Sequence, residues 1–397
     1  MANEALDTLA AVRVALIRGA LLRRWELPNY VLPQFDVTCF ASWYTAAQLN
    51  VAQPPVRGLP SLADTTAKLG PRAAGAVELV AGSIDRLIGL ERALRGFDIA
   101  HALELVYPVS LQAIRARDRG WCRRAVITVM DNIPFNPPAN ALVRRRVERV
   151  ARGIDHAIAI TERARLRLET AGVPPERITV LPLGIDMSQF RPAEPGPPGS
   201  GPMRVLSVAR LEPAKGVEDL VIAIGLATRA GQDLHLTLLG EGPLRERLLG
   251  IARAMGVADR VDVRGGVTWP AVAEVYREHD VFVLASAPTR TWREQFGFAA
   301  VEAMASGLPV LVGDSGSLPE VVGRPESLVR PHDPIALAEH LARLAGDPDL
   351  CAEQGRLNRR WAVERYDIER IRQRLRDLYL AVLEQPSAAR PGRSSAA

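Results

Sequence analysis

Two glutamates, Glu294 and Glu302, with seven residues between them, stand in the stretch of this chain that is richest in chemical information. Glu294 lies in a polar loop after the apolar run Val281–Leu284, and the amphipathic segment that contains Glu302 begins near Gly297 or Phe298. The first backbone N–H groups of a helix are free and carry the positive end of its dipole, which suits a phosphate. The pattern therefore predicts an anion site at a helix N-terminus, with one carboxylate before it and one inside the helix.

Two cations precede this stretch at positions that could face the same anion. Arg210 follows the apolar run Val205–Val208, and Lys215 comes just before the amphipathic segment Val217–Ala230. Strand ends and helix starts of this kind meet at the carboxyl edge of a parallel sheet, where ligands bind. Fixed positive charge at that edge can neutralise a diphosphate leaving group. Only two of the 50 basic residues are lysines, and one of them is Lys215.

Apolar, β-branched runs alternate with amphipathic segments along the chain, so its elements are expected to form parallel sheets with helices on both faces. The runs predicted to be strands are Val12–Ile17, Val37–Phe40, Ala125–Met130, His156–Ile160, Ile178–Leu181, Val205–Val208, Leu234–Leu239, Val261–Val263, Val281–Leu284 and Pro309–Val312. The segments predicted to be helices in the second half are Val217–Ala230, Pro243–Met255, Pro270–His279 and Phe298–Ser306. This alternation predicts an α/β fold of doubly wound, Rossmann-like sheets.

The length of 397 residues argues for two domains, because a single hydrophobic core stops growing at roughly 250–300 residues. Residues 191–203, rich in proline and glycine, are predicted to be the linker between an N-terminal domain of residues 1–190 and a C-terminal domain of residues 204–365. Residues 366–384 are expected to form a helix that packs back toward the N-terminal domain. The polar tail 385–397 is expected to be disordered.

Composition and the absence of several motifs exclude other classes of protein. Apolar residues make up 48% and charged residues 24% of the chain, as in ordinary globular proteins. No apolar run approaches the roughly 20 residues of a membrane-spanning helix, and no secretory signal is expected. Neither G-x-G-x-x-G nor a P-loop motif is present, which argues against a nicotinamide or flavin cofactor. The three cysteines lack metal-ligand spacing and indicate reduced thiols in a cytoplasmic protein.

The chain resembles the retaining glycosyltransferases of family 4, or group 1, on the residues described above. The E-x7-E element of that family is similar to Glu294 and Glu302 in EQFGFAAVEAMASGLPV, and its R-x4-K clamp is similar to Arg210 and Lys215. Weaker similarities are GEGPLRERL, HDVFVLAS and GSLPEVV in the second half and ITVLPLGIDMSQFRP in the first. The resemblance covers residues 10–380 and implies the GT-B architecture, in which two Rossmann-like domains face each other across a cleft.

The resemblance also implies a role for each residue of the second domain. Arg210 and Lys215 would bind the diphosphate of a nucleotide-sugar donor, UDP- or GDP-linked, and Glu302 would bind its ribose. Glu294 would act as the catalytic carboxylate and hold the transferred sugar. Glu294 would be assisted by the backbone N–H groups of Phe296, Gly297 and Phe298. The implied front-face mechanism retains the anomeric configuration and needs neither a metal ion nor a further cofactor.

The first domain departs from the pattern of this family at two places. Where many members have a glycine-rich loop after the first strand, this chain has only Gly19, which we expect to approach the donor phosphate. Trp25, Glu26 and Tyr30 follow it and suit a sugar-like acceptor. Many members also carry a histidine directly before the position of Asp131. Asp131 either replaces that histidine in catalysis or belongs to a structural turn.

The positive charge of the chain lies entirely in its first half. Residues 1–190 hold 24 basic and 18 acidic side chains, a net charge of +6, within a total of +5. Ten of these basic side chains form two clusters of arginines, Arg115, Arg117, Arg119, Arg123 and Arg124, and Arg144, Arg145, Arg146, Arg149 and Arg152. They form either solvated helix faces or a contact with anionic lipid, which would place the protein at the inner face of the plasma membrane. Nucleic acid is not expected as a partner, because no known binding module is present.

The predicted function is the transfer of a sugar from a nucleotide-diphospho-sugar to a hydroxyl of a glycan, a lipid-linked sugar or a small glycoside. One alternative is a nucleotide-sugar epimerase or hydrolase of the same fold. Another is a non-catalytic subunit that binds nucleotide sugars for a partner enzyme. A glycoside hydrolase also needs two carboxylates, but it has no use for the cations Arg210 and Lys215.

Overall fold

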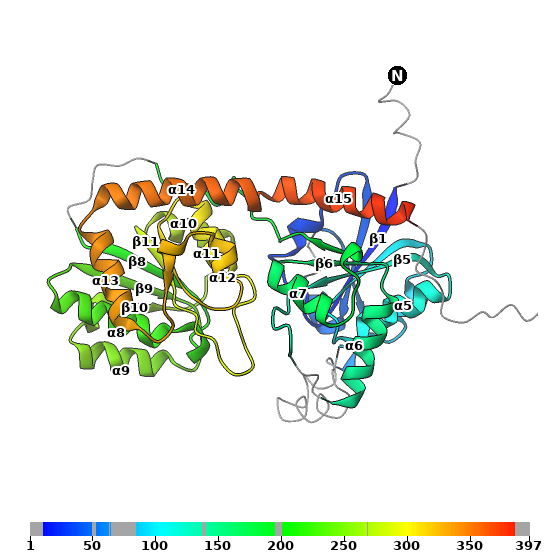
Figure 1. Ribbon diagram of the computed structural model, residues 1–397, viewed down its shortest axis with the longest axis horizontal. Coiled ribbons are helices and arrows are strands. Elements are labelled where there is room, and N and C mark those ends of the chain that lie inside the picture. The colour runs from blue at the N-terminus through cyan, green and yellow to red at the C-terminus, as the bar shows by residue number, and fades with distance from the viewer. Residues whose placement is uncertain are drawn as a thin grey trace, which may run out of the picture. The chain divides into compact units, whose positions relative to one another are not determined.

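The computed structural model describes residues 11–49, 53–62, 64, 85–136, 140–194, 201–267 and 269–385. The chain divides into two compact units, the first made of residues 1–183 and 370–397 and the second of residues 184–369. Both units are α/β structures built on parallel sheets (Figure 1). The central residues of the predicted linker, 195–200, and the predicted disordered tail after residue 385 lie outside the described residues.

The first unit holds a seven-stranded parallel sheet in the order β3-β2-β1-β4-β5-β6-β7. Its strands are β1 (Val12–Gly19), β2 (Phe35–Ser42), β3 (Val56–Leu59), β4 (Phe97–Leu103), β5 (Cys122–Val129), β6 (His156–Ala159) and β7 (Ile178–Val180). Its helices are α1 (Trp43–Gln48), α4 (Leu90–Ala93), α5 (Pro108–Asp118), α6 (Ala141–Gly153), α7 (Glu162–Thr170) and most of α15 (Ile368–Glu384). The residues of β6 are all buried, as expected for a strand covered on both faces.

Helix α15 packs on the sheet of the first unit through polar as well as apolar contacts. The hydroxyl of Tyr379 lies 2.6 Å from Nδ1 of His101 on β4. Nε of Arg124, on β5, donates to the carbonyl of Val382 at 2.8 Å, near the C-terminal end of the helix. Leu375, Tyr379 and Val382 are buried on this face. The last helix of the chain is therefore part of the core of the first unit.

The second unit holds a six-stranded parallel sheet in the order β10-β9-β8-β11-β12-β13. Its strands are β8 (Met203–Val208), β9 (Leu234–Leu239), β10 (Val261–Arg264), β11 (Val281–Leu284), β12 (Val310–Gly313) and β13 (Leu328–Val329). Its helices are α8 (Val217–Arg229), α9 (Arg245–Met255), α10 (Trp269–Arg277), α11 (Phe298–Ala305), α12 (Leu318–Val322), α13 (Pro334–Ala345) and α14 (Pro348–Tyr366). Every residue of the central strand β11 is buried, so helices cover both faces there.

Backbone segments approach each other closely at the carboxyl edge of this second sheet. Gly216, which begins α8, has φ of 62°, and a Cβ atom there would lie 2.0 Å from the carbonyl oxygen of Ala285. A Cβ atom on Gly313, at the end of β12, would lie 2.2 Å from the carbonyl oxygen of Ser286. Only glycine permits both contacts. The loops after β8, β11 and β12 are thereby held together at the edge where the predicted site lies.

The boundary between the units falls at residues 183 and 184, whereas the sequence predicted it at the linker 191–203. Residues 184–192 already pack with the second unit. The N–H of Ile185 donates to the carbonyl of Tyr366 at 2.7 Å, and Phe190 is fully buried with its ring 5.8 Å from that of Tyr276. Proline and glycine content marks where regular structure stops, but it does not show to which core the preceding apolar residues belong.

Candidate active site

The centre of the site in the second unit is an ion pair between Lys215 and Glu294. Nζ of Lys215 lies 2.7 Å from Oε2 of Glu294, and the hydroxyl of Ser286 donates to the same oxygen at 2.6 Å. Glu294 is 7% exposed and Ser286 is fully buried. The ammonium also lies 4.7 Å from the centre of the Trp292 ring, within the range of a cation–π contact. The loops after β8 and β11 thus meet in one polar cluster.

The other predicted cation, Arg210, lies in the loop between β8 and α8 but outside this cluster. Its side chain is 64% exposed and pairs with Glu212, at 2.6 Å between Nη1 and Oε1. An exposed pair of this kind is held by little free energy, about 1 kcal/mol or less, so its guanidinium can turn to another anion. The structure therefore joins Lys215 to Glu294 and leaves Arg210 facing solvent.

Glu302 lies inside α11, where a buried tyrosine holds its carboxylate. The hydroxyl of Tyr276, on α10, donates to Oε2 of Glu302 at 2.8 Å and lies 3.1 Å from the carbonyl oxygen of Ala299. Burial, together with the charge of Glu302, raises the pKa of Tyr276 well above its usual value. Tyr276 therefore remains a donor at all physiological pH values and fixes one oxygen of Glu302. Glu302 as a residue is partly exposed.

Helix α11 begins at a backbone conformation that only glycine adopts readily. Gly297 caps the helix with φ of 82°, and a Cβ atom there would lie 2.4 Å from Cδ2 of Leu318. Phe296 is buried, with its ring 4.6 Å from that of Phe298 and 5.5 Å from that of Tyr366. These rings fix the backbone of residues 296–298, so that the first N–H groups of α11 follow directly on Glu294.

In the first unit, Asp131 follows β5 and is held by an arginine. Its Oδ2 atom lies 3.1 Å from Nε of the buried Arg167, and its Oδ1 atom accepts the N–H of Ile133 at 3.1 Å. The second of these bonds is a turn contact of the kind that aspartate makes with its own backbone. The structure therefore shows Asp131 as an anchored carboxylate that keeps a partly exposed side chain.

A second carboxylate, Glu104, lies beside Asp131 and was not predicted from the sequence. It follows β4 with φ of 61°, and its Oε1 atom accepts the N–H groups of Met130 at 2.7 Å and of Asp131 at 3.1 Å. Burial, with a smaller contribution from the charge of Asp131, raises the pKa of Glu104 to about 7. A buried carboxyl with a shifted pKa at the end of a strand is typical of a functional site.

Gly19 ends β1 and turns the chain with φ of 59°. A Cβ atom there would lie 3.3 Å from Cβ of Asp85, whose carboxylate accepts the N–H of Ala20 at 3.2 Å. The tight turn, which lies within the first unit, is therefore sufficient to explain why position 19 is a glycine. Trp25, in the same loop, is partly exposed.

Glu26 and Tyr30, predicted on the acceptor side, lie instead in a buried network around Arg18. Arg18 is fully buried, and its Nε lies 3.2 Å from Oε2 of Glu26. Its Nη2 donates to the hydroxyl of Tyr30 at 2.7 Å. Glu26 and Tyr30 are each 2% exposed, which leaves them no surface for an acceptor in this conformation. Their place in the sequence suggested binding, because a short polar loop does not reveal that an arginine turns inward.

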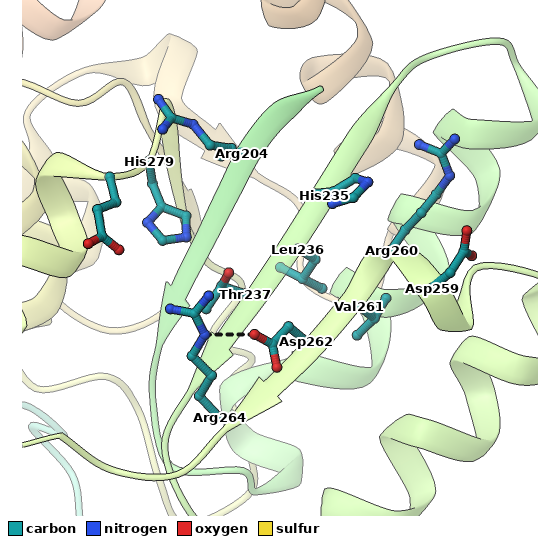
Figure 2. A pocket seen from close by; sticks show the side chains of 11 residues that line it. Arg204, His235, Leu236, Thr237, Asp259, Arg260, Val261, Asp262, Arg264 and His279 are labelled. Atoms are coloured by element: carbon teal, nitrogen blue, oxygen red, sulfur yellow. Dashed lines mark hydrogen bonds and ion pairs between the residues drawn. The ribbon is translucent and has the colours of Figure 1, made fainter. Parts of the chain in front are cut away.

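A cavity of the second unit lies away from these residues. It has a volume of about 530 Å³ and is lined from β8, β9 and β10, including Arg204 and His235 near the amino ends of their strands. Figure 2 shows that Arg264 points to Asp262, with Nε 2.7 Å from its carboxylate. Ligands of doubly wound sheets bind at the opposite, carboxyl edge. The cluster of Lys215 and Glu294, and not this cavity, is therefore the candidate active site.

Both halves of the chain match families of known proteins. Residues 22–189 match the family described as Glycosyltransferase Family 4, and residues 193–361 match Glycosyl transferases group 1. The chain belongs to the group 1 glycosyltransferases. It is 29% identical over 301 residues to a GDP-mannose-dependent alpha-(1-6)-phosphatidylinositol monomannoside mannosyltransferase of Mycobacterium tuberculosis, covering 70% of this chain and 76% of the relative. It is 33% identical over 227 residues to an MMP alpha-(1->4)-mannosyltransferase of Mycolicibacterium hassiacum, covering 55% and 52%.

Solved structures support the GT-B fold of this glycosyltransferase. The Anabaena protein HepE, in complex with UDP, superposes with a TM-score of 0.73 over 93% of this chain and 99% of its own, at 17% identity. Sucrose-phosphate synthase from Thermosynechococcus elongatus gives a TM-score of 0.67 over 93% and 98%, at 20% identity. The predicted family and fold class are therefore confirmed.

Two features are absent from the described residues. No helix among them is both long and apolar enough to cross a membrane. No group of three or more histidine, cysteine, aspartate or glutamate side chains among them is arranged to hold a metal ion.

Proposed function

We propose that this group 1 glycosyltransferase moves a sugar from a nucleotide-diphospho-sugar to a hydroxyl acceptor with retention of the anomeric configuration. The observation that carries the proposal is the cluster in which Lys215 and Ser286 both contact Oε2 of Glu294, directly before the N-terminus of α11. It combines a cation for a leaving diphosphate with a carboxylate for a sugar that acquires positive charge. A glycosyl transfer needs both in one place.

Each part of a donor has a residue that suits it in the second unit. Lys215 is the diphosphate ligand, and the exposed Arg210 exchanges Glu212 for the second phosphate. The N–H groups at the start of α11, near Gly297 and Phe298, bind the hydroxyls of the sugar with Glu294. Glu302, fixed by Tyr276, accepts the hydroxyls of the ribose. Gly19, in the first unit, is proposed to approach the donor phosphate from the acceptor side.

The proposed reaction needs no further base and no metal ion. The bond between the anomeric carbon and the diphosphate oxygen breaks, and its electron pair leaves with the diphosphate, whose charge Lys215 and Arg210 stabilise. Glu294 stabilises the oxocarbenium-like sugar. The acceptor oxygen attacks from the face that the diphosphate leaves, and its proton passes to the departing phosphate oxygen. The new bond therefore keeps the original configuration.

The relatives favour a mannosyl donor. The mycobacterial relative is GDP-mannose-dependent by name and matches 70% of this chain. The structures solved with UDP are only 17–18% identical to this chain, so they support the fold and do not indicate which nucleotide its donor carries. We therefore propose GDP-mannose as the donor to test first and UDP-sugars second.

The acceptor is proposed to be a sugar-containing molecule bound by the first unit, near Asp131 and Trp25. Glu104 and Arg167 hold the turn that carries Asp131, so they position this carboxylate. The name of the mycobacterial relative includes a lipid-linked mannoside, which supports a lipid-linked sugar at the cytoplasmic face of a membrane. The proposed localisation is thus cytoplasmic and peripheral to the membrane.

Binding and turnover test this proposal in sequence. A ligand that binds only the native state raises the melting temperature, so GDP, UDP and their sugars are first compared by thermal shift. Turnover of the best donor is then measured for Glu294→Gln, with Glu353→Gln, an exposed glutamate on α14, as the control. We expect a loss of about 100-fold or more in kcat for Glu294→Gln with nucleotide affinity retained. Unchanged kcat would contradict the assignment of Glu294, and sugar release that no acceptor accelerates would favour a hydrolase.

A further inference from the structure

Helices α5 and α6 pack against each other in the first unit (Figure 1). A groove lined by residues of both helices gathers five arginines. Its volume is about 430 Å³. The arginines come from separate parts of the chain, Arg86 before α4, Arg115 on α5, and Arg145, Arg146 and Arg149 on α6. The described residues that line the groove include no aspartate or glutamate. This part of the surface is therefore a concave site of one sign of charge.

Other arginines nearby in the sequence differ from those of the groove, because they have partners within the first unit. Arg117 pairs with Asp118 at 2.7 Å and with Asp155 at 2.9 Å. Arg124 binds carbonyl groups at the end of α15. In contrast, no ion pair to Arg86, Arg115, Arg145 or Arg149 is found within the described part of the chain. These four guanidiniums are available to an external anion.

Arg146 shows that the groove holds charge away from water. It is 7% exposed, and its Nη1 atom donates to the carbonyl oxygen of Val106 at 2.6 Å. Burial lowers the pKa of its guanidinium. Arg145 and Arg149 lie beside it at the spacing of one helix face, so three positive charges face the same hollow. A bound anion would stabilise this arrangement, because repulsion between like charges is strongest where water is excluded.

The rest of the lining is apolar or already bonded. Leu111 on α5 and Leu142 on α6 line the groove, and Leu142 is exposed. The amide of Gln112 bonds to the backbone of Leu87 and to Glu91, so that nearby carboxylate is already engaged. The arginines match the oxygens of a phosphate, and the leucines suit an apolar group attached to it. A groove of this composition fits a phosphorylated organic molecule better than an acidic peptide.

We propose that the α5–α6 groove is a phosphoryl-binding site, separate from the donor site, that takes either a soluble phosphorylated metabolite or the headgroup of a phospholipid. A guanidinium group is planar and can bind two phosphate oxygens at once. Several such groups around one groove bind a phosphate tightly. The site does not depend on the proposed glycosyl transfer, because the test measures binding and not turnover.

Two double variants on the same helix test the site. Arg145→Gln/Arg149→Gln removes two charges from the groove. Arg144→Gln/Arg152→Gln removes two charges from exposed positions of α6 that do not line it. Both variants keep the donor site, so any phosphate that binds there contributes equally to both. Binding of inorganic phosphate is measured by calorimetry on the full chain, and circular dichroism verifies that both variants are folded.

We expect the groove variant to bind phosphate about tenfold more weakly or worse, because each guanidinium–phosphate contact is a charge-assisted bond. The matched variant should stay close to the wild type. An equal loss in both variants, or a loss in neither, would overturn the proposal. Sedimentation with phosphatidylcholine vesicles, with and without phosphatidylinositol, then distinguishes the sources. A lipid headgroup is indicated if the groove variant alone fails to bind the anionic vesicles, and a soluble metabolite if both variants bind them equally.

Discussion

The ammonium of Lys215 lies 2.7 Å from the carboxylate of Glu294, although the two residues are 79 positions apart in the chain. Both side chains are largely buried, with exposed fractions of 14% and 9%. In the proposed reaction one of them binds the diphosphate and the other the sugar. Their contact therefore spans the bond that breaks, and it holds both groups in place in the absence of a donor.

Removing the lysine alone should destabilise the second unit. Lys215→Met leaves the buried carboxylate of Glu294 without its cation, and breaking a buried pair typically costs about 3–5 kcal/mol. The double variant Lys215→Met/Glu294→Gln removes both charges and should recover most of this stability without recovering turnover. Urea unfolding of the single and double variants measures the effect. A single variant as stable as the wild type would show that the pair does not stabilise the fold.

Tyr276 should affect donor binding through Glu302 and not the chemical step. Tyr276→Phe removes the hydroxyl that lies 2.8 Å from the carboxylate. The loss of one hydrogen bond of about 1 kcal/mol should raise the donor KM several-fold while kcat stays within about twofold. Tyr366→Phe is the matched control, because that buried hydroxyl donates to the carbonyl of Val321, at 2.9 Å. Equal changes in KM for both variants would contradict a specific role of Tyr276.

The sequence predicted most of the strands because buried parallel strands carry continuous apolar runs. Leu234–Leu239 and Val281–Leu284 coincide with β9 and β11 residue for residue. It predicted no run at the central strand β4, Phe97–Leu103, which carries an aspartate and a histidine. It also missed β3, Val56–Leu59, which contains an arginine and a glycine, and β13, which has two residues. Both lie at the edges of their sheets, where one side lacks a neighbouring strand and the apolar signal is weak.

The residues of the candidate site were predictable from the sequence only where they belong to a motif. The spacing of Glu294 and Lys215 from their strands placed both at one sheet edge, but nothing in the sequence showed that they touch. Ser286 and Trp292 complete the cluster. Ser286 ends the weaker similarity HDVFVLAS, which assigned it no role, and Trp292 belongs to no pattern that could have singled it out. The inward turn of Arg18 had no signal either, because arginine is rarely buried in full.

Gly297 should be required both for the start of α11 and for donor binding. Gly297→Ala introduces a side chain at φ of 82° and a contact of 2.4 Å with Leu318, with strain of about 1–2 kcal/mol. Gly256→Ala is the control, since Gly256 has φ of 75° at a helix end but no atom within 4 Å of a Cβ. We expect both variants to lower the melting temperature, and only Gly297→Ala to weaken nucleotide binding in a thermal-shift titration. Weaker binding in both would show a general loss of stability instead.

Glu104 should make the stability of the first unit depend on pH. Its pKa is about 7 in the folded chain against an ordinary value of 4.5, so the folded state keeps a proton that the unfolded state has released. The contribution of Glu104 to the free energy of unfolding is therefore greatest below pH 4.5. As the pH rises to about 7, this contribution is lost, and the free energy of unfolding falls by about 3 kcal/mol in total.

Glu104→Gln removes this titration while its side-chain oxygen can still accept the N–H groups of Met130 and Asp131. The variant should therefore gain stability relative to the wild type between pH 5 and pH 8, and the difference between the two proteins cancels the titration of all other groups. Urea unfolding at several pH values measures this difference in the free energy of unfolding, with a spectroscopic signal that reports on the first unit. A difference that does not change with pH would mean that Glu104 is already ionised in the folded protein at pH 5, because contacts with Met130, Asp131 and Arg167 outweigh its burial.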